Sequence, residues 1–446
     1  MSSTASTAST RLRDLDSPRT LESVTTLSLL NLLRLRPALR GFITVCGIAE
    51  LNAQMLNVAI SWYVYSSTHD PMSLAYIGLA RFIPNIGMVL IAGQTADRID
   101  RRRIVALSLF LQALGIATFG AMLAAGMSSV RPVYLLLVVI SSAQAFCSPA
   151  MSAMLPSLVS AEEFPRAVAV SSSAFQICTL CGPAAGGLVY ALNGPGMFAF
   201  CAALYLIAIT QVRRLAGKCK EPGEPKEGGA QANTPVDESP LGGIRYVRSN
   251  RLLLSLISLD LFAVLLGGIT ALLPIYARDI LHAGPAALGC LRCAPGIGAA
   301  IIGLILAHRV IRRRVGKLML GSVAGFGFAT VVFSVSTNLW LSFGALVVAG
   351  GFDMVSMVIR QTLVQVSTPD AMRGRVSAVQ GVFVGASSEL GEFESGATAA
   401  LFGTVPAALL GGLGTLAVVA LWTGLFPELP RADKLVMEGT NDGGVA

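Results

Sequence analysis

The chain carries one segment twice, at a constant spacing. Residues 80–87 return as residues 291–298, with Arg, Pro, Ile and Gly at the same places 211 positions later. The next loop repeats at the same offset, since residues 96–103 and 307–314 both contain an alanine followed by clustered arginines. Two copies of one unit in a very apolar chain indicate two similar halves around a shared centre, as in many secondary transporters.

The composition indicates that these halves lie in a membrane. Hydrophobic residues make up 54% of the 446 residues and charged residues only 13%, whereas a soluble domain carries about 25% charged residues. A helix that crosses a bilayer needs about 20 mostly apolar residues, because the hydrocarbon offers no water to the backbone. The sequence predicts twelve such spans, at residues 41–65, 73–96, 104–127, 132–156, 165–192, 195–213, 252–277, 285–308, 317–336, 338–362, 375–402 and 405–426.

The predicted fold class is therefore an all-α membrane protein of 12 transmembrane helices in two pseudo-symmetric six-helix bundles. A segment rich in Pro, Gly, Glu and Lys separates the bundles and is expected to be a solvated linker. Residues 21–36 are expected to form either a short amphipathic helix or part of a disordered tail. The predicted divisions are an N-terminal tail (1–40), a first bundle (41–213), the linker (214–250), a second bundle (251–426) and a C-terminal tail (427–446).

Basic residues give the chain an expected orientation. The formal net charge is +8, and the arginines and lysines gather before the first span, after the second, in the linker, after the eighth and before the eleventh. Because Lys and Arg mark the cytoplasmic side, both termini are expected in the cytoplasm and the protein in the cell (inner) membrane. The charge is confined to short loops between apolar spans, which favours membrane lipids as partners and argues against nucleic acid.

Metal binding and catalysis find little support. Cys178 and Cys181, with Cys290 and Cys293, have the spacing of a four-thiolate zinc site. Both pairs lie in apolar spans where thiolates are costly, so packing is the favoured interpretation and no metal or other cofactor is expected. The chain has three histidines and no His-Glu-x-x-His, Gly-x-Ser-x-Gly or Walker-type sequence, which argues against an enzyme and against ATP as the energy source. A sensor or scaffold that binds a ligand without moving it is the remaining alternative.

Several motifs point to a known family. The loop after the second span has Gly93, then Ala96-Asp97-Arg98, then a basic cluster, and resembles the signature of the major facilitator superfamily, with Asp100 where that signature has a turn glycine. Other motifs resemble the enterobactin-exporter branch, which also contains macrolide and other drug exporters. They are Arg81-Phe-x-Pro, Leu155-Pro156-x-Leu158-Val159, Gly182-Pro183-x-x-Gly186-Gly187, Arg373-Gly374-Arg375-Val376 and the segment from Ser387 to Gly396.

The resemblance implies export by alternating access, in which two six-helix bundles rock about a central cavity and the proton gradient drives transport. The implied partners are protons and a bulky small-molecule substrate, a siderophore in the first interpretation and a drug or macrolide antibiotic in the second. A monomer is expected. The loop motif further suggests that Asp97 caps a neighbouring helix and pairs with an arginine of its own loop, as a latch on the inner gate. The alternative is that these arginines only set topology and bind lipid phosphates.

Charged side chains inside the spans are costly, so each is a functional candidate. Arg81 and Arg292 are equivalent in the two copies, and Glu50 and Asp260 are nearly so. The candidates for proton coupling or substrate binding are Glu50, Asp260, Arg292, Glu389, Glu392 and Glu394, and the candidates for gating are Arg81, Gly93, Asp97, Arg98, Arg101, Arg102, Gly182, Pro183, Gly187, Asp353 and Arg360.

The eleventh span breaks the symmetry of the repeat. It carries three glutamates, whose equivalents 209 positions earlier in the fifth span are uncharged. Glu389 and Glu392 share a helix face, and Glu394 is turned away. Crowded carboxylates suit the uptake and release of protons. We therefore expect Arg81 to pair with Glu392 or Glu394 until protonation or substrate breaks the pair; the alternative is a permanent ion pair that only positions the helices.

Two further groups have structural alternatives. Asp353 and Arg360 are two turns apart in the tenth span and share a helix face, but Arg360 is also close enough to the cytoplasmic end to extend to the membrane surface. Gly182, Pro183 and Gly187 allow close packing and a kink, which serve either movement of the fifth span or its static packing.

Overall fold

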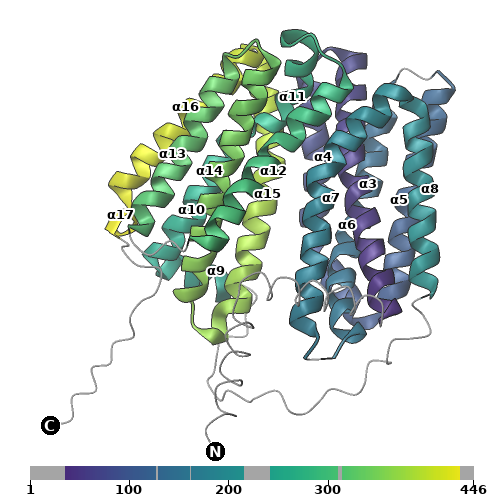
Figure 1. Cartoon of the computed structure of the whole chain (residues 1–446), viewed down its shortest axis with the longest axis horizontal. Coiled ribbons are helices and arrows are strands. Elements are labelled where there is room, and N and C mark those ends of the chain that lie inside the picture. The colour runs from purple at the N-terminus through teal and green to yellow at the C-terminus, as the bar shows by residue number, and fades with distance from the viewer. Residues whose placement is uncertain (1–35, 127–128, 161, 215–241, 310–313, 432–446) are drawn as a thin grey trace, which may run out of the picture.

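The computed structural model describes residues 36–126, 129–160, 162–214, 242–309 and 314–431, and its regular elements are helices throughout. Residues 21–35 of the expected amphipathic segment and residues 215–241 of the expected linker lie outside this part. Two bundles stand side by side (Figure 1). The first contains α3 (Pro37–Thr68), α4 (Pro71–Arg98), α5 (Arg101–Ala124), α6 (Arg131–Leu158), α7 (Phe164–Leu192) and α8 (Gly194–Arg214). The second contains α9 (Gly242–Ser249), α10 (Arg251–Leu266), η2 (Ile269–Leu272), α11 (Leu273–Ile275), η3 (Tyr276–Ile280), α12 (Pro285–His308), α13 (Val315–Ser334), α14 (Leu339–Val366), α15 (Asp370–Phe402), α16 (Thr404–Leu425) and α17 (Glu428–Arg431).

The predicted fold class is confirmed, because each predicted span coincides with one long helix or, for the seventh, a run of helical segments. Ten of these, counting α10 to η3 as one, have the length and hydropathy to cross a membrane. The two outside that set are α4, which carries Arg81 and Asn85 midway, and α15, which carries the three glutamates. The chain is therefore an integral membrane protein. Its two most polar spans, α4 and α15, are not equivalent to each other in the repeat.

The prediction of one continuous seventh span is wrong in detail. α10 ends at Leu266, and the chain continues through Gly267 and Gly268 into the short segments η2, α11 and η3. A Cβ on Gly268 would lie 2.6 Å from the carbonyl oxygen of Gly391 in α15. The helix breaks at this glycine pair because α15 comes close to its backbone.

Local side chains define where helices begin. Asp70 Oδ1 accepts a hydrogen bond from the Met72 backbone N–H at 3.0 Å at the start of α4, and Asn250 and Asn338 act in the same way at the starts of α10 and α14. Such caps satisfy amide groups that have no partner inside the helix. The Asn250 cap separates α10 from α9, a short helix inside the segment expected to be a linker.

The apolar core shows how the bundles meet. One cluster of buried side chains runs through the first bundle and continues into the second bundle at Ile269–Ala277 and Leu288. A separate cluster, from Val247 to Leu429, occupies the part of the second bundle near α9 and α17. We call the end that contains Thr68 and Ile280 the far end, and the end that contains Arg101 and Arg373 the basic end. The halves share a core at the far end and have separate cores toward the basic end.

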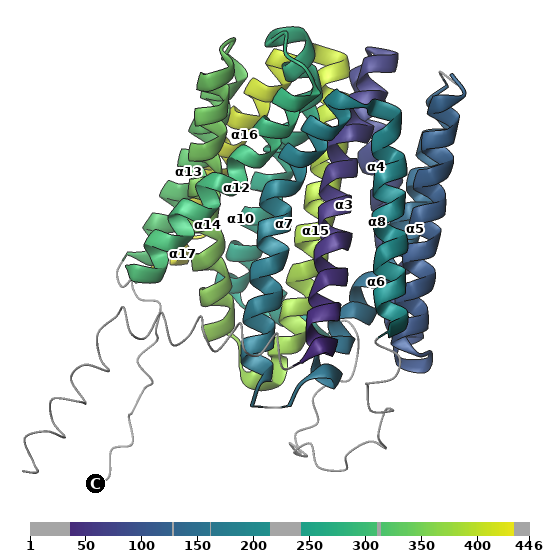
Figure 2. The same ribbon diagram turned by 45° about the vertical axis from the view of Figure 1, so that its right-hand side comes forward.

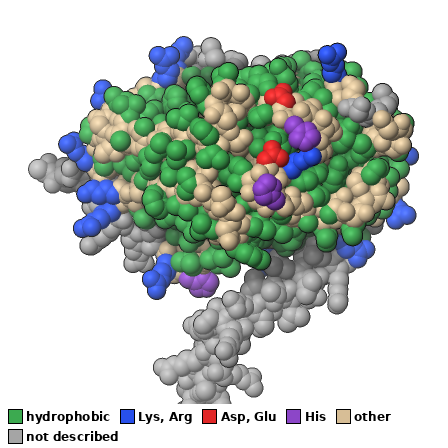
Figure 3. Space-filling view, turned by 90° about the horizontal axis from the view of Figure 1, so that it is seen from above, with side chains coloured by type: hydrophobic (Ala, Val, Ile, Leu, Met, Phe, Trp, Pro, Cys, Tyr) green, Lys and Arg blue, Asp and Glu red, His purple; other side chains and the backbone are tan. Residues whose placement is uncertain are grey.

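Two helix pairs make the most extensive contacts between the halves, α4 with α15 and α7 with α12. In the repeat, α4 is equivalent to α12 and α7 to α15, so the two interfaces are equivalent to each other. Figure 2 shows α7 running along the second bundle. Seen from the far end, acidic side chains lie together with histidine and basic side chains on a largely apolar face, and other Lys and Arg side chains are scattered around its rim (Figure 3).

Candidate functional site

Glycines bring the two halves into backbone contact near the far end. A Cβ on Gly289 of α12 would lie 2.5 Å from the Pro183 carbonyl oxygen and 3.1 Å from the Gly187 Cα in α7. A Cβ on Gly78 of α4, the equivalent of Gly289, would lie 2.8 Å from the Glu389 carbonyl oxygen in α15. In the same α4–α15 interface, a Cβ on Gly396 would lie 2.8 Å from the Ala75 backbone nitrogen. Both interfaces thus close at the same level because glycine has no side chain there.

The remaining glycines of the motif pack inside each half. A Cβ on Gly182 would lie 2.5 Å from the Gln54 Cβ in α3, and one on its equivalent Gly391 would lie 2.9 Å from the Val264 carbonyl oxygen in α10. Gly182 and Gly391 therefore hold α7 and α15 against equivalent helices of their own bundles. Pro183 lies inside α7 at the α12 contact.

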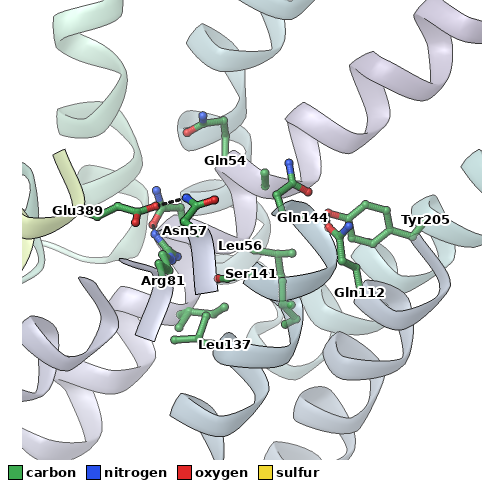
Figure 4. A pocket seen from close by; sticks show the side chains of 14 residues that line it. Gln54, Leu56, Asn57, Arg81, Gln112, Leu137, Ser141, Gln144, Tyr205 and Glu389 are labelled. Atoms are coloured by element: carbon green, nitrogen blue, oxygen red, sulfur yellow. Dashed lines mark hydrogen bonds between the residues drawn. The ribbon is translucent and has the colours of Figure 1, made fainter. Parts of the chain in front are cut away.

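Polar side chains meet at the α4–α15 interface (Figure 4). Asn85 Nδ2 in α4 donates to Glu389 Oε1 in α15 at 2.6 Å. One turn away, Arg81 Nη1 donates to Asn57 Oδ1 in α3 at 2.7 Å. Glu389 also lies in electrostatic range of Arg81 and Glu392. A carboxylate of the second half is thus held directly by an amide of the first.

The predicted ion pair between Arg81 and Glu392 or Glu394 is not formed in this structure. Arg81 is instead directed to Asn57, and among the described residues no ion pair joins Arg81 to a glutamate. Glu394 accepts a hydrogen bond from Thr398 Oγ1 of its own helix at 2.8 Å. Residue counts give the depth of each group along its helix but not the direction in which its side chain points, so equal depth does not by itself bring Arg81 to these glutamates in this conformation.

Arg292 occupies the equivalent position to Arg81 without an equivalent partner. Its buried Nε has no hydrogen-bond partner, and the guanidinium lies in electrostatic range of Glu392 and Arg81. The residue 211 positions after Asn57 is Gly268, which has no side chain to accept a bond. Two arginines and two glutamates, one arginine from each half, therefore form a loosely paired cluster between the bundles.

Glu50 and Asp260, nearly equivalent in the sequence, have different environments. Glu50 Oε1 accepts hydrogen bonds from Gln54 Nε2 at 2.8 Å and from Thr179 Oγ1 of α7 at 2.9 Å. Asp260 forms a buried ion pair with Arg360 of α14. The first carboxylate is held by neutral groups and the second by a cation.

The expected roles of Asp353 and Arg360 require correction. Arg360 is buried against Asp260 and does not extend to the membrane surface. Asp353 is exposed, although it lies on the same face of α14 as Arg360. The sequence places these two residues on one face, but the neighbouring helix α10 supplies the partner of Arg360.

A cavity of about 190 Å³ opens beside the charged cluster. It lies within the first bundle, and among the described residues Glu389 of α15 is the one that lines it from the second half (Figure 4). Sequence reasoning missed its polar lining, although amide side chains within apolar spans were a usable signal. These lining residues are Gln54, Asn57, Asn85, Gln112, Ser141, Gln144 and Tyr205.

At the basic end, the structure describes only part of the loop after α4. The side chains of Asp97 and Arg98 and the surroundings of Gly93 lie outside the described residues. Arg101 Nη1 donates to the Ala153 carbonyl oxygen of α6 at 2.7 Å. Asp100, which replaces the signature glycine, caps α5 by accepting from the Arg102 N–H at 3.0 Å and has a negative φ of −53°. The turn is thus one that does not need glycine.

A second link at the basic end joins α3 to α7. Arg36 Nη2 lies 3.2 Å from Glu163 Oε2. The Ser160 backbone N–H, followed by the Ser160 hydroxyl and the Arg36 charge, holds the pKa of Glu163 below its usual value. This ion pair lies within the first half and leaves the interfaces unaffected.

At the far end, a hydrogen bond crosses between the halves. The Tyr65 hydroxyl at the end of α3 donates to Asp279 of η3. Tyr65 itself is buried. This contact adds a polar link to the glycine contacts of the closed end.

Comparison with known proteins supports the architecture. Residues 36–442 match the family described as "Transmembrane secretion effector". The chain is 27% identical over 412 residues to the enterobactin exporter EntS of Citrobacter koseri, which covers 90% of this chain and 95% of that protein. The same identity and coverage hold for EntS of Escherichia coli O1:K1 / APEC.

Solved structures share the fold at low sequence identity. A bacterial homologue of the human lysosomal transporter Spinster, inward-facing and unoccupied, matches with a TM-score of 0.66 and 13% identity, over 89% of this chain and 96% of that one. The nucleoside transporter NupG matches with a TM-score of 0.65 and 12% identity, over 87% of this chain and 99% of that one.

Proposed function

Because the chain belongs to the transmembrane secretion effector family and has the major facilitator fold, we propose that it is a proton-coupled exporter of a bulky organic molecule. A siderophore is the first candidate substrate, since the enterobactin exporters are similar along nearly their whole length. The protein lies in the cell (inner) membrane with its basic end and both termini in the cytoplasm, because loops rich in Lys and Arg stay on that side. Transport proceeds by alternating access in a monomer.

The observation that carries this proposal is the position of Glu389. Its carboxylate lines the cavity of the first half while its helix belongs to the second half, and Asn85 holds it at 2.6 Å. Glu392, one turn away, lies in range of Arg292. Carboxylates at a seam between moving bodies can link their protonation to the separation of those bodies.

In the mechanism, the carboxylates favour the conformation closed at the far end. Substrate that enters from the basic end weakens the contacts of these carboxylates, α15 separates from α4, and the far end opens. After the substrate leaves, Glu389 or Glu392 takes up a proton from outside, which removes the negative charge that attracts Arg81 and Arg292 and keeps the bond from Asn85 weak, since charge-assisted hydrogen bonds are the stronger ones. The protonated protein returns to the state closed at the far end, and release of the proton to the cytoplasm restores the contacts.

The proposal is tested by secretion. A strain that lacks its own siderophore exporter is compared with and without this chain, by assay of siderophore in the medium. Restored secretion supports the proposal. Unrestored secretion, with the protein present in the membrane, removes that siderophore as the substrate and leaves efflux of macrolides or other drugs as the function to test.

Proton coupling is tested separately in vesicles. Glu392→Gln is expected to lose most of the transport driven by an imposed pH gradient, while exchange of labelled substrate without a gradient continues. Glu394→Gln is the matched variant on the same helix and is expected to retain driven transport, because an amide oxygen can also accept the bond from Thr398. Wild-type rates for Glu392→Gln would contradict the coupling role.

A further inference from the structure

One hydrogen-bond donor at the inner end of the cavity has no partner. Gln112 of α5 and Tyr205 of α8 are each 1% exposed and line the cavity. The Tyr205 hydroxyl donates to Gln112 Oε1 at 3.0 Å, which fixes the orientation of the amide. Gln112 Nε2 is then buried without a hydrogen-bond partner among the described residues. Since buried polar groups are almost always paired, this donor indicates a place for an acceptor atom.

The rest of the cavity limits what can bring that acceptor. Between the two ends, Leu56 and Ile60 of α3 and Leu137 and Ile140 of α6 supply the apolar part of the wall, and Ser141 and Gln144 of α6 add polar groups beside them. At the opposite end lie Arg81 and Glu389 (Figure 4). Apolar side chains on two helices can hold a flat apolar group, and the polar groups around them favour oxygen substituents on it.

The volume sets the size of this group. The cavity measures about 190 Å³, and an apolar cavity of roughly 150 Å³ is known to accept benzene. One six-membered aromatic ring with its substituents therefore fits, whereas a fused ring system or a whole bulky molecule does not. The remainder of such a molecule would lie outside, between the two halves.

We propose that this cavity is a subsite for one oxygen-bearing aromatic ring of the transported molecule. A ring oxygen accepts from Gln112 Nε2 at the inner end, and a second acceptor faces Arg81 at the mouth. That the ring belongs to a transported molecule rests on the proposed function. Binding of the ring itself does not depend on the direction of transport, on proton coupling or on the rest of the substrate. Tyr205 is a positioning residue, because it orients the Gln112 amide without facing the ligand's acceptor.

The test measures binding to the purified full chain in lipid nanodiscs by titration calorimetry. The probes are 2-hydroxybenzoate, which carries acceptor oxygens on one ring, and benzylamine, which carries a cation and no acceptor on the same ring. We expect 2-hydroxybenzoate to bind the wild type and to bind Gln112→Leu at least tenfold more weakly. Gln112→Glu, which keeps the size and the acceptor for Tyr205 but removes the donor, is expected to prefer benzylamine.

Asn52→Leu is the matched control. Asn52 is another fully buried amide of the first half with an unpartnered atom, Oδ1, but it lies outside the cavity lining and donates to the Cys201 carbonyl oxygen. Its substitution should leave the affinity for 2-hydroxybenzoate unchanged. If Gln112→Leu does not fold, Tyr205→Phe replaces it and is expected to weaken binding severalfold, because the amide is then free to rotate.

The outcomes separate the subsite from the export function. Equal affinity of wild type and Gln112→Leu, or no binding of 2-hydroxybenzoate to the wild type, overturns the subsite even where secretion is restored. Selective loss of binding in Gln112→Leu supports the subsite even where secretion is not restored. An equal loss in Asn52→Leu also overturns it, because the effect would then belong to the fold of the bundle.

Discussion

The α4–α15 and α7–α12 interfaces share their backbone geometry and differ in their chemistry. Gly78 and Gly289 are equivalent residues, and each brings its helix against the backbone of the opposite half. At the next level, Asn85 and Glu389 form a hydrogen bond at 2.6 Å in the first interface. The equivalent pair in the second interface is Gly296 with Leu180, where a Cβ on the glycine would lie 2.9 Å from the leucine Cδ1.

Glycine contacts are present in both interfaces, whereas among the described residues the hydrogen-bonded polar pair is present only in the α4–α15 interface. Under the proposed function, the glycine contacts allow the halves to close and the polar pair makes closure depend on a titratable group. Charges inside a membrane protein are costly, so on this proposal one interface provides the dependence while the other keeps the equivalent contact without it.

The largest expected effect on stability concerns two nearly equivalent carboxylates inside the bundles, Glu50 in the first and Asp260 in the second. Asp260→Leu leaves Arg360 buried without its partner and should cost about 3–5 kcal/mol of unfolding free energy. Glu50→Leu loses only bonds from neutral groups and should cost about 1 to 3 kcal/mol. Unfolding in detergent measures both, and Asp260→Leu combined with Arg360→Met should recover most of the loss. Equal losses in the two single variants would contradict the difference in environment.

Glycine substitutions test whether the two interfaces close alike. Gly289→Ala and Gly78→Ala each place a Cβ against backbone atoms and should disfavour the state closed at the far end by about 1–3 kcal/mol. Distances between spin labels at the far ends of α4 and α15 should lengthen in both variants. Gly87→Ala is the control in α4, because its Cβ would meet nothing within 4 Å. Lengthening in only one of the two variants would show that the interfaces are not equivalent in closure.

A double variant removes the chemical difference itself. Asn85→Gly with Glu389→Leu copies the apolar pair into the polar interface, and removes a charge-assisted hydrogen bond worth about 1.5–3 kcal/mol. The variant should fold, and the dependence of its conformational equilibrium on pH should decrease because one titratable group is gone. Spin-label distances measured from pH 5 to 8 check this. An unchanged pH profile would mean that Glu392 or another group, and not Glu389, makes the conformational equilibrium depend on pH.

The smallest expected effect concerns the two arginines. Arg292→Leu removes a buried guanidinium whose Nε has no partner, so its thermal stability should change by less than about 1 kcal/mol. Arg81→Leu breaks the 2.7 Å bond to Asn57 and should reduce both stability and transport more. Thermal unfolding and uptake into vesicles compare the two variants. A larger loss in Arg292→Leu would mean that its attraction to Glu392 outweighs its unpaired burial.

Much of the fold follows from local pattern. Spans of about 20 apolar residues become helices in a membrane whatever surrounds them, and two copies of one sequence give two similar bundles. The break after Leu266 was missed because its cause is the approach of α15, which lies far along the chain. Asp100 was visible as a departure from the family signature, but its role as a cap depended on the turn that it forms.

In the candidate site, too, some features follow from single segments and others from the packing of the helices. The sequence by itself determined which side chains are unusual inside a membrane, including Arg81, Arg292 and the glutamates of α15, because charge and apolar length are properties of single segments. Only the tertiary structure decided their partners: Asn57 for Arg81, Asn85 for Glu389 and Arg360 for Asp260. The physical reason is that hydrogen bonds and ion pairs act over a few ångströms, and the rotation and crossing of packed helices, which no single segment encodes, decide which groups come that close.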